Sequence, residues 1–509
     1  MFMPGCLSKN KSPSDVCPFE QPDISTPIYK STRPHLFRIL NKALPEPLTI
    51  LLPVAPRILQ AESDGEYPNW KQTANVKYIL DQFTIDGGVV GLTRKANANA
   101  ETQDGELYDI SVYLPIQTDR DVVFTGAYPS KEVLIEQFHV QEVYSVADLP
   151  AHLALKVKGG ESVVSTVSQD ILFQSLPASV ISELEGENVK IPFSFEAQQA
   201  FWNAQLVRLT YASRLAAWVH KKVGKYISKA DSITEIELHA EFTRLSALCG
   251  GDLQSYPPIV GAGPDAAVLH YRTGTFRGLA HAPVPDETFI LIDAAPEFVG
   301  YTSDLTRTYP RHKKWNAQMK EVYGIVERVQ SKFVHTHYQL DADWAAINLL
   351  SKIDLTEELI KAGFILGTVE EAVAANVANT VFMPHGLGHP VGLEVHDPTP
   401  ASFIGSRFEA AFIPNEELGS FFAWSKETHP RLYDAALANF KVPKGHVCTV
   451  EPGVYFIPKL LEQVKKSPIA KFVNWTKIEE GDYVSLGGVR IEDVVLFDHA
   501  GNKRIITRE

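Results

Sequence analysis

Cysteine is scarce in this chain. Only four cysteines occur among 509 residues, at Cys6, Cys17, Cys249 and Cys448, and none of them lies at the close spacing of a thiolate metal site. Small secreted scaffolds held together by disulfides are dense in cysteine, so that class is excluded. We predict a reducing, cytoplasmic location.

Long apolar runs and an excess of positive charge are also missing. The first apolar run, LTILLPVAP from Leu48, is broken by prolines and is far shorter than the roughly 20 residues that span a bilayer. The opening MFMPGCLSKNKSPSD lacks the apolar region of a secretory signal. Forty-eight basic residues stand against 61 acidic ones, a formal net charge of −13. Nucleic acids and anionic membranes attract concentrated positive charge, so we predict neither as a partner.

Length and patterning predict two domains. A single core stops growing at roughly 250 to 300 residues, and this chain is far longer. Residues 1–33 are rich in Ser, Pro and Lys, which predicts a mobile tail. Residues 34–184 mix strand-like and helix-like segments, as in an α/β domain, and the polar residues 185–195 form a linker. Residues 196–509 indicate helices over a bent antiparallel sheet. The predicted fold class is α+β with a smaller N-terminal α/β domain.

Three of the sixteen histidines lie in one apolar, glycine-rich segment, VFMPHGLGHPVGLEVHD. They are His385, His389 and His396. A lone histidine in such a segment is usually a core or turn residue, but neutral imidazoles can bind a metal or carry protons near neutral pH. The clustering of three histidines favours a functional site.

Four acidic residues lie beside apolar, strand-like runs: Asp293, Asp304, Glu451 and Glu492. Burial of a neutral polar group without a partner costs about 2 to 7 kcal/mol, and an isolated charge costs more. Each acid alone could be an ordinary edge-strand residue, and the two aspartates could be solvated on a surface hairpin. Together with the histidines, the four acids predict a pair of divalent metal ions.

The spacing of Asp293 and Asp304 predicts a specific geometry. If a four-residue loop, residues 297–300, closes a hairpin, the two aspartates face each other across the strands. Their Cβ atoms would then lie roughly 4.5 to 5.5 Å apart. Like charges this close repel, and two divalent ions about 3.5 to 4 Å apart would turn the repulsion into attraction.

These residues and their surroundings resemble the pita-bread metallopeptidases, and among them the Xaa-Pro dipeptidases and Xaa-Pro aminopeptidases. The strings PHGLGH, VHD, TVEPG and GGVRIED carry the resemblance, with VLHY around His270 as a further family string. It covers the chain from about Glu196 to the end, and before that only the pattern of an aminopeptidase P N-terminal domain fits. The resemblance implies a pita-bread catalytic domain, of the creatinase and aminopeptidase type, at residues 196–509.

The resemblance also implies the roles of individual residues. The metal ligands would be Asp293, Asp304, His389, Glu451 and Glu492. Glu451 would also exchange a proton with the substrate. The other catalytic residues would be His270, His385 and His396, which would line the substrate cleft, with His396 placed to stabilise the oxyanion. Arg490 is a further catalytic candidate, because it lies two residues before Glu492 on the same strand face and could bind substrate or orient a ligand. Four carboxylates and one imidazole favour Mn²⁺ for both ions, with Zn²⁺, Co²⁺ and Fe²⁺ left open. The family usually dimerises, so a homodimer is expected.

The predicted reaction is hydrolysis of the peptide bond between an N-terminal residue and proline, in a dipeptide or short peptide. General peptidases handle this bond poorly because proline lacks an N–H and has a fixed φ. A Xaa-Pro dipeptidase is the first reading, and a Xaa-Pro aminopeptidase acting on longer peptides is the alternative. A metal-free binding protein and a creatinase-like amidinohydrolase share the fold, and the intact ligand set disfavours both.

One departure from the dipeptidase pattern concerns substrate length. Dipeptidases usually carry an arginine about fourteen residues before the glutamate equivalent to Glu451, where it can clamp the carboxylate of a dipeptide. In this chain the position is Leu437. Two readings stay open: Arg431 replaces the clamp, or the site accepts longer peptides.

Overall fold

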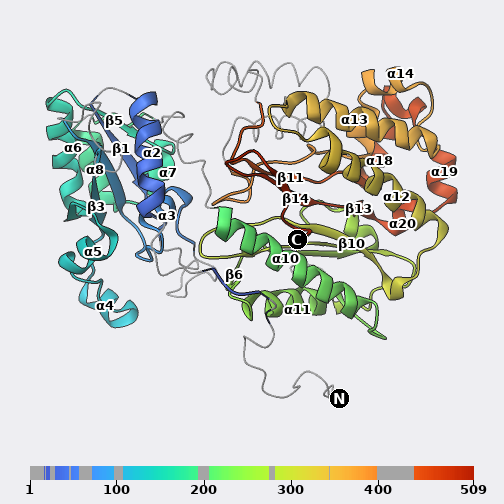
Figure 1. Ribbon diagram of the computed structural model, residues 1–509, viewed down its shortest axis with the longest axis horizontal. Coiled ribbons are helices and arrows are strands. Elements are labelled where there is room, and N and C mark those ends of the chain that lie inside the picture. Colours follow the sequence, from blue (N-terminus) through green and yellow to red (C-terminus); the bar gives the residue numbers. More distant parts are fainter. Residues whose placement is uncertain are drawn as a thin grey trace. The chain divides into compact units, whose positions relative to one another are not determined.

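Most of the chain is described by the computed structural model. The described residues are 17, 19–22, 29–44, 47–56, 71–96, 107–187, 189–192, 206–273, 281–342, 344–397 and 441–509. Contacts group the chain into two units, one of residues Asp23–Asn203 and one of Met1–Pro22 together with Ala204–Glu509 (Figure 1). The domain limits inferred from the sequence remain predictions.

The N-terminal unit contains a five-stranded sheet. Its strands are β1 (Leu48–Pro53), β2 (Val89–Arg94), β3 (Tyr108–Leu114), β4 (Glu142–Ser145) and β5 (Ser162–Ser165). They lie in the order β4-β3-β2-β1-β5. The central pairs are antiparallel, and the outer strands β4 and β5 pair in parallel with β3 and β1. All six residues of β1 are buried, so both faces of the sheet are covered.

Helices cover the two faces of this sheet. They are α2 (Tyr29–Ala43), α3 (Ala74–Leu80), α4 (Asp119–Thr125), α5 (Lys131–Phe138), α6 (Leu149–Lys158), α7 (Gln169–Gln174) and α8 (Ala178–Gly186). Figure 1 shows α2 and α3 on one face, with α6 and α8 on the other. Leu149 and Leu153 of α6 and Leu184 of α8 share a core with Leu51 of β1. The predicted α/β character of this unit is confirmed.

A helix begins inside the predicted mobile tail. Because α2 starts at Tyr29, the predicted tail limit at residue 33 is wrong. Arg33 is buried in this helix, and its guanidinium donates to the carbonyls of Ile79, Phe138 and His139 at 2.8, 2.6 and 2.9 Å. Because the buried Arg33 is charged, it interrupts the apolar periodicity by which a helix is predicted from the sequence. The start of α2 was therefore missed.

The C-terminal unit contains short antiparallel ladders. Its strands are β6 (Leu253–Gln254), β7 (Ile259–Ala262), β8 (Phe289–Asp293), β9 (Pro296–Glu297), β10 (Thr306–Pro310), β11 (Val447–Val450), β12 (Gly453–Tyr455), β13 (Gly488–Arg490), β14 (Asp493–Phe497) and β15 (Lys503–Ile505). They form the ladders β10-β8-β7, β11-β14-β15, β12-β13 and β6-β9. Two residues separate β8 from β9, β11 from β12 and β13 from β14, and at each of these points the chain leaves one ladder and enters another.

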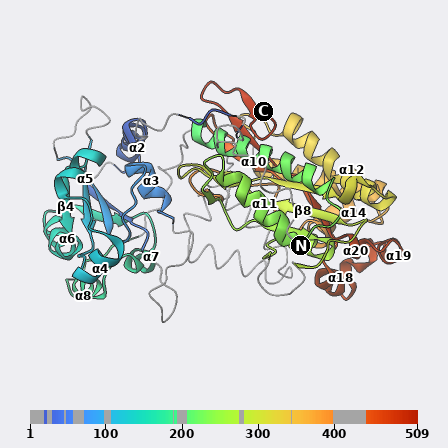
Figure 2. The same ribbon diagram turned by 90° about the horizontal axis from the view of Figure 1, so that it is seen from below.

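Two helical layers enclose the central strand β8. The helices of this unit are α10 (Leu206–Ile227), α11 (Glu235–Ala247), α12 (Ala317–Lys332), α13 (Trp344–Lys361), α14 (Val369–Ala374), α18 (Pro458–Lys465), α19 (Trp475–Glu480) and α20 (Tyr483–Leu486). Ile290 and Ile292 pack with α10 and α11, whereas Phe289 and Leu291 pack with α12 and α13. Figure 1 shows these helix pairs on opposite sides of the strands, and Figure 2 shows the molecule from the side of α10 and α11. Among the described residues, no helix combines the length and apolarity needed to cross a membrane.

Two helix starts are set by local sequence. A threonine followed three residues later by glutamate predicts a capping box, because each side chain can bond the backbone N–H of the other residue. Thr234 with Glu237 begins α11, and Thr368 with Glu371 begins α14, both with the reciprocal bonds. Both predicted helix starts are confirmed.

Candidate metal centre

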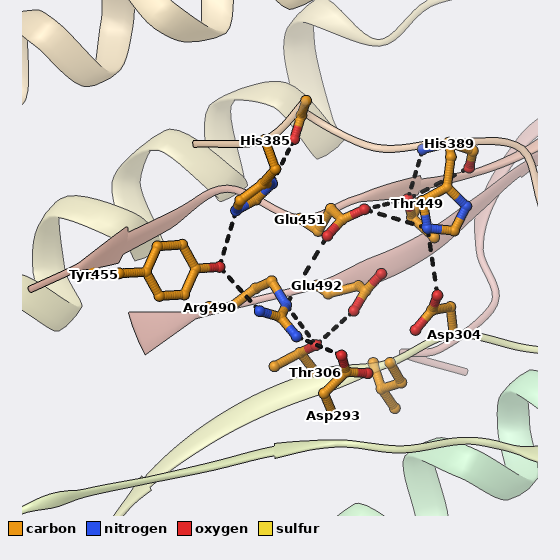
Figure 3. Close-up of polar contacts among 12 residues, drawn as sticks. Asp293, Asp304, Thr306, His385, His389, Thr449, Glu451, Tyr455, Arg490 and Glu492 are labelled. Carbon is orange, nitrogen blue, oxygen red and sulfur yellow. Dashed lines mark hydrogen bonds and ion pairs between the residues drawn. The ribbon is translucent and has the colours of Figure 1, made fainter. Parts of the chain in front are cut away.

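Two strand junctions place Glu451 and Glu492 together. β11 pairs with β14 up to Val450 opposite Asp493, and β12 pairs with β13 from Gly453 onward. Glu451 lies in the gap between β11 and β12, and Glu492 in the gap between β13 and β14. Both residues are therefore outside the ladders at one point, and Figure 3 shows their carboxylates pointing toward each other.

The two aspartates are not direct partners across the hairpin, so that prediction is wrong. β8 and β10 pair in a register that sets Asp293 opposite Thr306. The hairpin closes in the two-residue loop Val299–Gly300, in which both residues have positive φ (46° and 84°), as in a type I′ turn. The shorter loop shifts the register by two residues. Asp304 is a diagonal neighbour of Asp293 on the same face.

Tyr256 joins the two aspartates. Its hydroxyl contacts Oδ1 of Asp293 in a short hydrogen bond and Oδ1 of Asp304 at 2.5 Å. Both carboxyl groups are buried, and burial raises the pKa of Asp293 while the Arg490 cation opposes the rise. Burial also disfavours ionised Asp304, but hydrogen bonding with His389 outweighs it and lowers the pKa.

His389 reaches the same point from the glycine-rich segment. Its Nε2 lies 3.4 Å from Oδ2 of Asp304 and 3.3 Å from Oε1 of Glu451. Nδ1 faces the carbonyl of Pro390 at 3.1 Å, which leaves Nε2 as the ligand atom. The segment lies against β11 at Gly388, where a Cβ atom would come within 2.1 Å of the Thr449 carbonyl oxygen. Only glycine permits this approach.

The described residues form three groups in which possible ligand atoms lie within 4.8 Å of one another. The groups are Asp293, Asp304 and Glu492; His389, Glu451 and Glu492; and Asp304, His389 and His396. Together they contain all five predicted ligands. Oε2 of Glu492 accepts from Thr306 at 2.6 Å, whereas Oε1 is buried and has no hydrogen-bond partner among the described residues. A buried carboxylate oxygen without a donor fits a cation ligand.

The charge balance of this centre also fits metal ions. Burial raises the pKa of Glu492 well above its usual range, and the neighbouring carboxylates of Asp304, Glu451 and Asp293 raise it further. Burial raises the pKa of Glu451 to about 7, against the opposing cations of His389 and Arg490. Four carboxylates crowded in a buried space lack positive charge, which divalent ions would supply.

Arg490 connects the acids to a line of polar side chains. Its guanidinium donates to Asp293 Oδ2 in a short contact, to Thr306 Oγ1 at 2.9 Å and to the Tyr455 hydroxyl at 3.0 Å. The Tyr455 hydroxyl lies 2.9 Å from Nε2 of His385. Figure 3 shows this line running from Asp293 through Arg490 and Tyr455 to His385.

The other two predicted histidines border the centre. The rings of His396 and His389 lie 4.0 Å apart, centroid to centroid. The positive charge of His389 lowers the pKa of His396 to about 4, and burial adds to the effect. His270 is exposed and lies near enough for its charge to act on both His385 and His396. The next residue, Tyr271, is held by a 2.8 Å hydrogen bond to Glu235.

A buried charge network stands behind Glu492. The carboxylate of Asp493 accepts from Arg307 at 2.6 Å, Gln330 at 2.7 Å and Arg508 at 2.7 Å. Arg307 also donates to the backbone carbonyl of Glu492 in a short contact. The paired charges of this network hold the backbone at Glu492, which is a predicted metal ligand.

Four polar residues at the centre were not predicted from the sequence: Tyr256, Thr306, Thr449 and Tyr455. Thr306 lies two residues from Asp304, and Thr449 two residues from Glu451 on β11, so strand periodicity could have found both. Tyr256 comes from a loop far away in sequence and has no local signal. Arg431 and Leu437, which concern the carboxylate clamp, lie outside the described residues.

Several known proteins are similar to this chain in sequence. A family model described as metallopeptidase family M24 matches residues 208–499, more than half of the chain. The chain belongs to metallopeptidase family M24. A probable Xaa-Pro aminopeptidase of Aspergillus fumigatus is 30% identical to this M24 peptidase over 373 residues, 72% of each chain. A probable Xaa-Pro aminopeptidase of Emericella nidulans is 33% identical over 296 residues, 58% of this chain and 56% of the relative.

Solved structures of aminopeptidase P resemble this M24 peptidase. The low-pH form from E. coli aligns with a TM-score of 0.70 and 19% identity over 96% of both chains. Proline aminopeptidase P II from Yersinia pestis aligns with a TM-score of 0.66 and 19% identity, over 94% of this chain and 95% of the other. At this identity the likeness shows the fold alone. The predicted pita-bread fold is confirmed, and so is a metallo-exopeptidase of the predicted family.

Proposed function

We propose that this M24 peptidase is a Xaa-Pro aminopeptidase, which removes the N-terminal residue from peptides longer than two residues when proline follows. The observation that carries the proposal is the gathering of the ligand atoms of His389 and four carboxylates in one cluster. Relatives named as probable Xaa-Pro aminopeptidases support it. They favour this alternative over the Xaa-Pro dipeptidase that the sequence strings suggested first.

Five residues would hold two divalent ions. Asp293 would bind one ion and His389 and Glu451 the other, while Asp304 and Glu492 would contact both, as the family resemblance implies. When bound, the ions supply Lewis acidity, which lowers the pKa of a water molecule and polarises the scissile carbonyl. The oxygen-rich set favours Mn²⁺.

Glu451 would move the proton. It would accept a proton from the attacking water and deliver it to the proline nitrogen, which has no hydrogen of its own and leaves only when protonated. Thr449 donates to Oε1 of Glu451 at 3.2 Å and so fixes the orientation of the carboxylate. This bond keeps the group aimed at the junction where the other carboxylates meet.

The remaining predicted site residues would bind and orient. His270 and His385 would line the substrate cleft, and His396 would donate a hydrogen bond to the oxyanion that develops on the scissile carbonyl. The Arg490 guanidinium already donates to Asp293, Thr306 and Tyr455. We therefore assign Arg490 to orienting Asp293 and not to direct contact with substrate.

Three wider features of the protein are part of the proposal. The first is a division into an N-terminal domain that ends at residue 184 and a C-terminal domain at residues 196–509, with a linker at 185–195. The second is a homodimer, as the family resemblance implies. The third is a cytoplasmic location, which the scarcity of cysteine supports.

Substrate length provides the test of this function. Metal-loaded protein should release alanine from Ala-Pro-Ala with a kcat/KM about tenfold or more above that for Ala-Pro, because the dipeptide brings an unpaired carboxylate close to an acidic site. Ala-Ala-Ala is the matched control and should be cleaved poorly. Product analysis by mass spectrometry measures all three. Cleavage of Ala-Pro alone would identify the protein as a dipeptidase. Cleavage of neither proline peptide would refute the proposal.

A further inference from the structure

Helix α13 carries two polar side chains into the interior beneath the histidine segment. Asn348 is fully buried and Lys352 nearly so, at 0% and 5% exposure. They lie four residues apart and therefore on one face of the helix. Other residues of the same helix, such as Trp344 and Leu355, belong to the main apolar core. A lysine buried beside an apolar core is unusual, because lysine is almost never fully buried unless its charge is paired.

Both side chains bond the backbone of residues 383–387. The Lys352 ammonium donates to the carbonyl of His385 in a short contact and to the carbonyl of Met383 at 3.4 Å. Oδ1 of Asn348 accepts from the N–H of Leu387 at 2.8 Å. This segment belongs to no helix or strand, so side chains satisfy backbone groups that no ladder would satisfy.

The Lys352 ammonium anchors this segment, and its burial costs free energy. Burial of an ammonium group costs several kcal/mol even after the protein relaxes. Burial lowers the pKa of Lys352 to about 7, and the Glu451 carboxylate opposes this shift. A leucine or methionine would fill the same space in an apolar helix without that cost. A charged side chain at a core position of a helix breaks the usual apolar pattern, and such exceptions are expected at functional sites.

The anchored segment carries His385, whose ring continues the line of bonds from Arg490. Arg490 donates to the Tyr455 oxygen, so the Tyr455 hydroxyl is free to donate its hydrogen to Nε2 of His385. Nδ1 then carries the ring proton, which faces the carbonyl of Gly386 at 2.8 Å. This direction requires a neutral ring. Burial and the cations of Lys352 and Arg490, with His270 adding, hold the pKa of His385 well below its usual range.

We propose that Lys352, supported by Asn348, is a positioning residue for the catalytic centre. It fixes the segment 383–387 so that the His385 ring stays bonded to Tyr455 and, through Arg490, to Asp293. The inference rests on the proposed function only for its kinetic consequence, since the position of the ring can be observed without substrate.

The test replaces Lys352 with methionine, which has similar length but neither charge nor donors. Histidine-labelled protein is examined by NMR, with the His385 ring signals identified by their loss in His385→Gln. In Lys352→Met these signals should shift, and kcat should fall about tenfold to a hundredfold, as expected for a small displacement of a catalytic group. KM and the number of bound metal ions should stay near those of the wild type.

Two further variants make the result decisive. Thr356→Val is the matched control, because its buried hydroxyl donates to the carbonyl of Lys352 within α13 and, among the described residues, to no group of the segment 383–387. It should leave the His385 signals and kcat unchanged. Asn348→Ala removes the second anchor and should shift the same signals even if Lys352→Met does not fold. Unshifted His385 signals in the folded variants would overturn the proposal, as would loss of metal. If the wild type cleaves no proline peptide while the signals shift, the proposed function fails and this inference stands.

Discussion

Asp304→Asn should abolish most of the activity and reduce the bound metal from two ions per chain to one or fewer. Asp304 contacts Tyr256 through one carboxylate oxygen and His389 through the other, and it belongs to two of the three groups able to hold an ion. An amide cannot supply the negative charge that a second cation needs. We expect kcat to fall about 10³-fold, since a metal site contributes several kcal/mol of transition-state stabilisation.

The measurement combines elemental analysis of the purified protein with hydrolysis of Ala-Pro-Ala. Asp286→Asn is the matched control, because Asp286 is an exposed aspartate of the same unit that pairs with Arg311, and it should retain full metal content and rate. Thermal unfolding shows whether each variant is folded. A folded Asp304→Asn protein with two ions and near wild-type turnover would remove Asp304 from the centre.

His396→Ala should lower kcat by about 10² to 10³-fold, the usual loss when one oxyanion donor is removed. His396 is exposed beside the centre, and its ring is tilted against that of His389. If it donates to the developing oxyanion and does not hold an ion, its loss affects the transition state more than ground-state binding. KM and metal content should therefore stay close to the wild-type values.

Steady-state kinetics and metal analysis on the same preparation separate these roles. His499→Ala is a suitable control, because His499 is exposed and lies in a turn after β14. It should change neither kcat nor metal content. Loss of an ion in His396→Ala would instead make His396 a metal ligand, which the group of Asp304, His389 and His396 permits geometrically.

Residue types predicted that these acids and histidines gather in one cluster, but they did not predict the geometry of the cluster. A carboxylate buried beside apolar strands is costly unless a cation or a hydrogen-bond donor binds it, so residue types alone indicate a site. The hairpin register depended on a loop length that the sequence leaves open. Val299 is β-branched and disfavours positive φ, so a two-residue turn ending at Gly300 was not expected.

Buried cations are the second kind of feature that sequence patterns miss. Arg33 and Lys352 occur in helices where a basic residue ordinarily indicates a solvated face. Each is buried because backbone carbonyls from distant segments accept its hydrogen bonds. Tertiary packing brings these carbonyls to the cations, so no local periodicity or motif in the sequence predicts the contacts. The capping boxes at Thr234 and Thr368, in contrast, involve residues three apart and were predicted correctly.

Return of metal to the stripped protein shows whether cleavage depends on two bound ions. The protein is freed of metal with a chelator, Mn²⁺ is added in steps, and bound ions and release of alanine from Ala-Pro-Ala are measured together. We expect no cleavage without metal and a rate that rises to a plateau at two bound ions per chain. Full cleavage by the metal-free protein, or a complete absence of bound metal at any concentration, would contradict a dinuclear aminopeptidase.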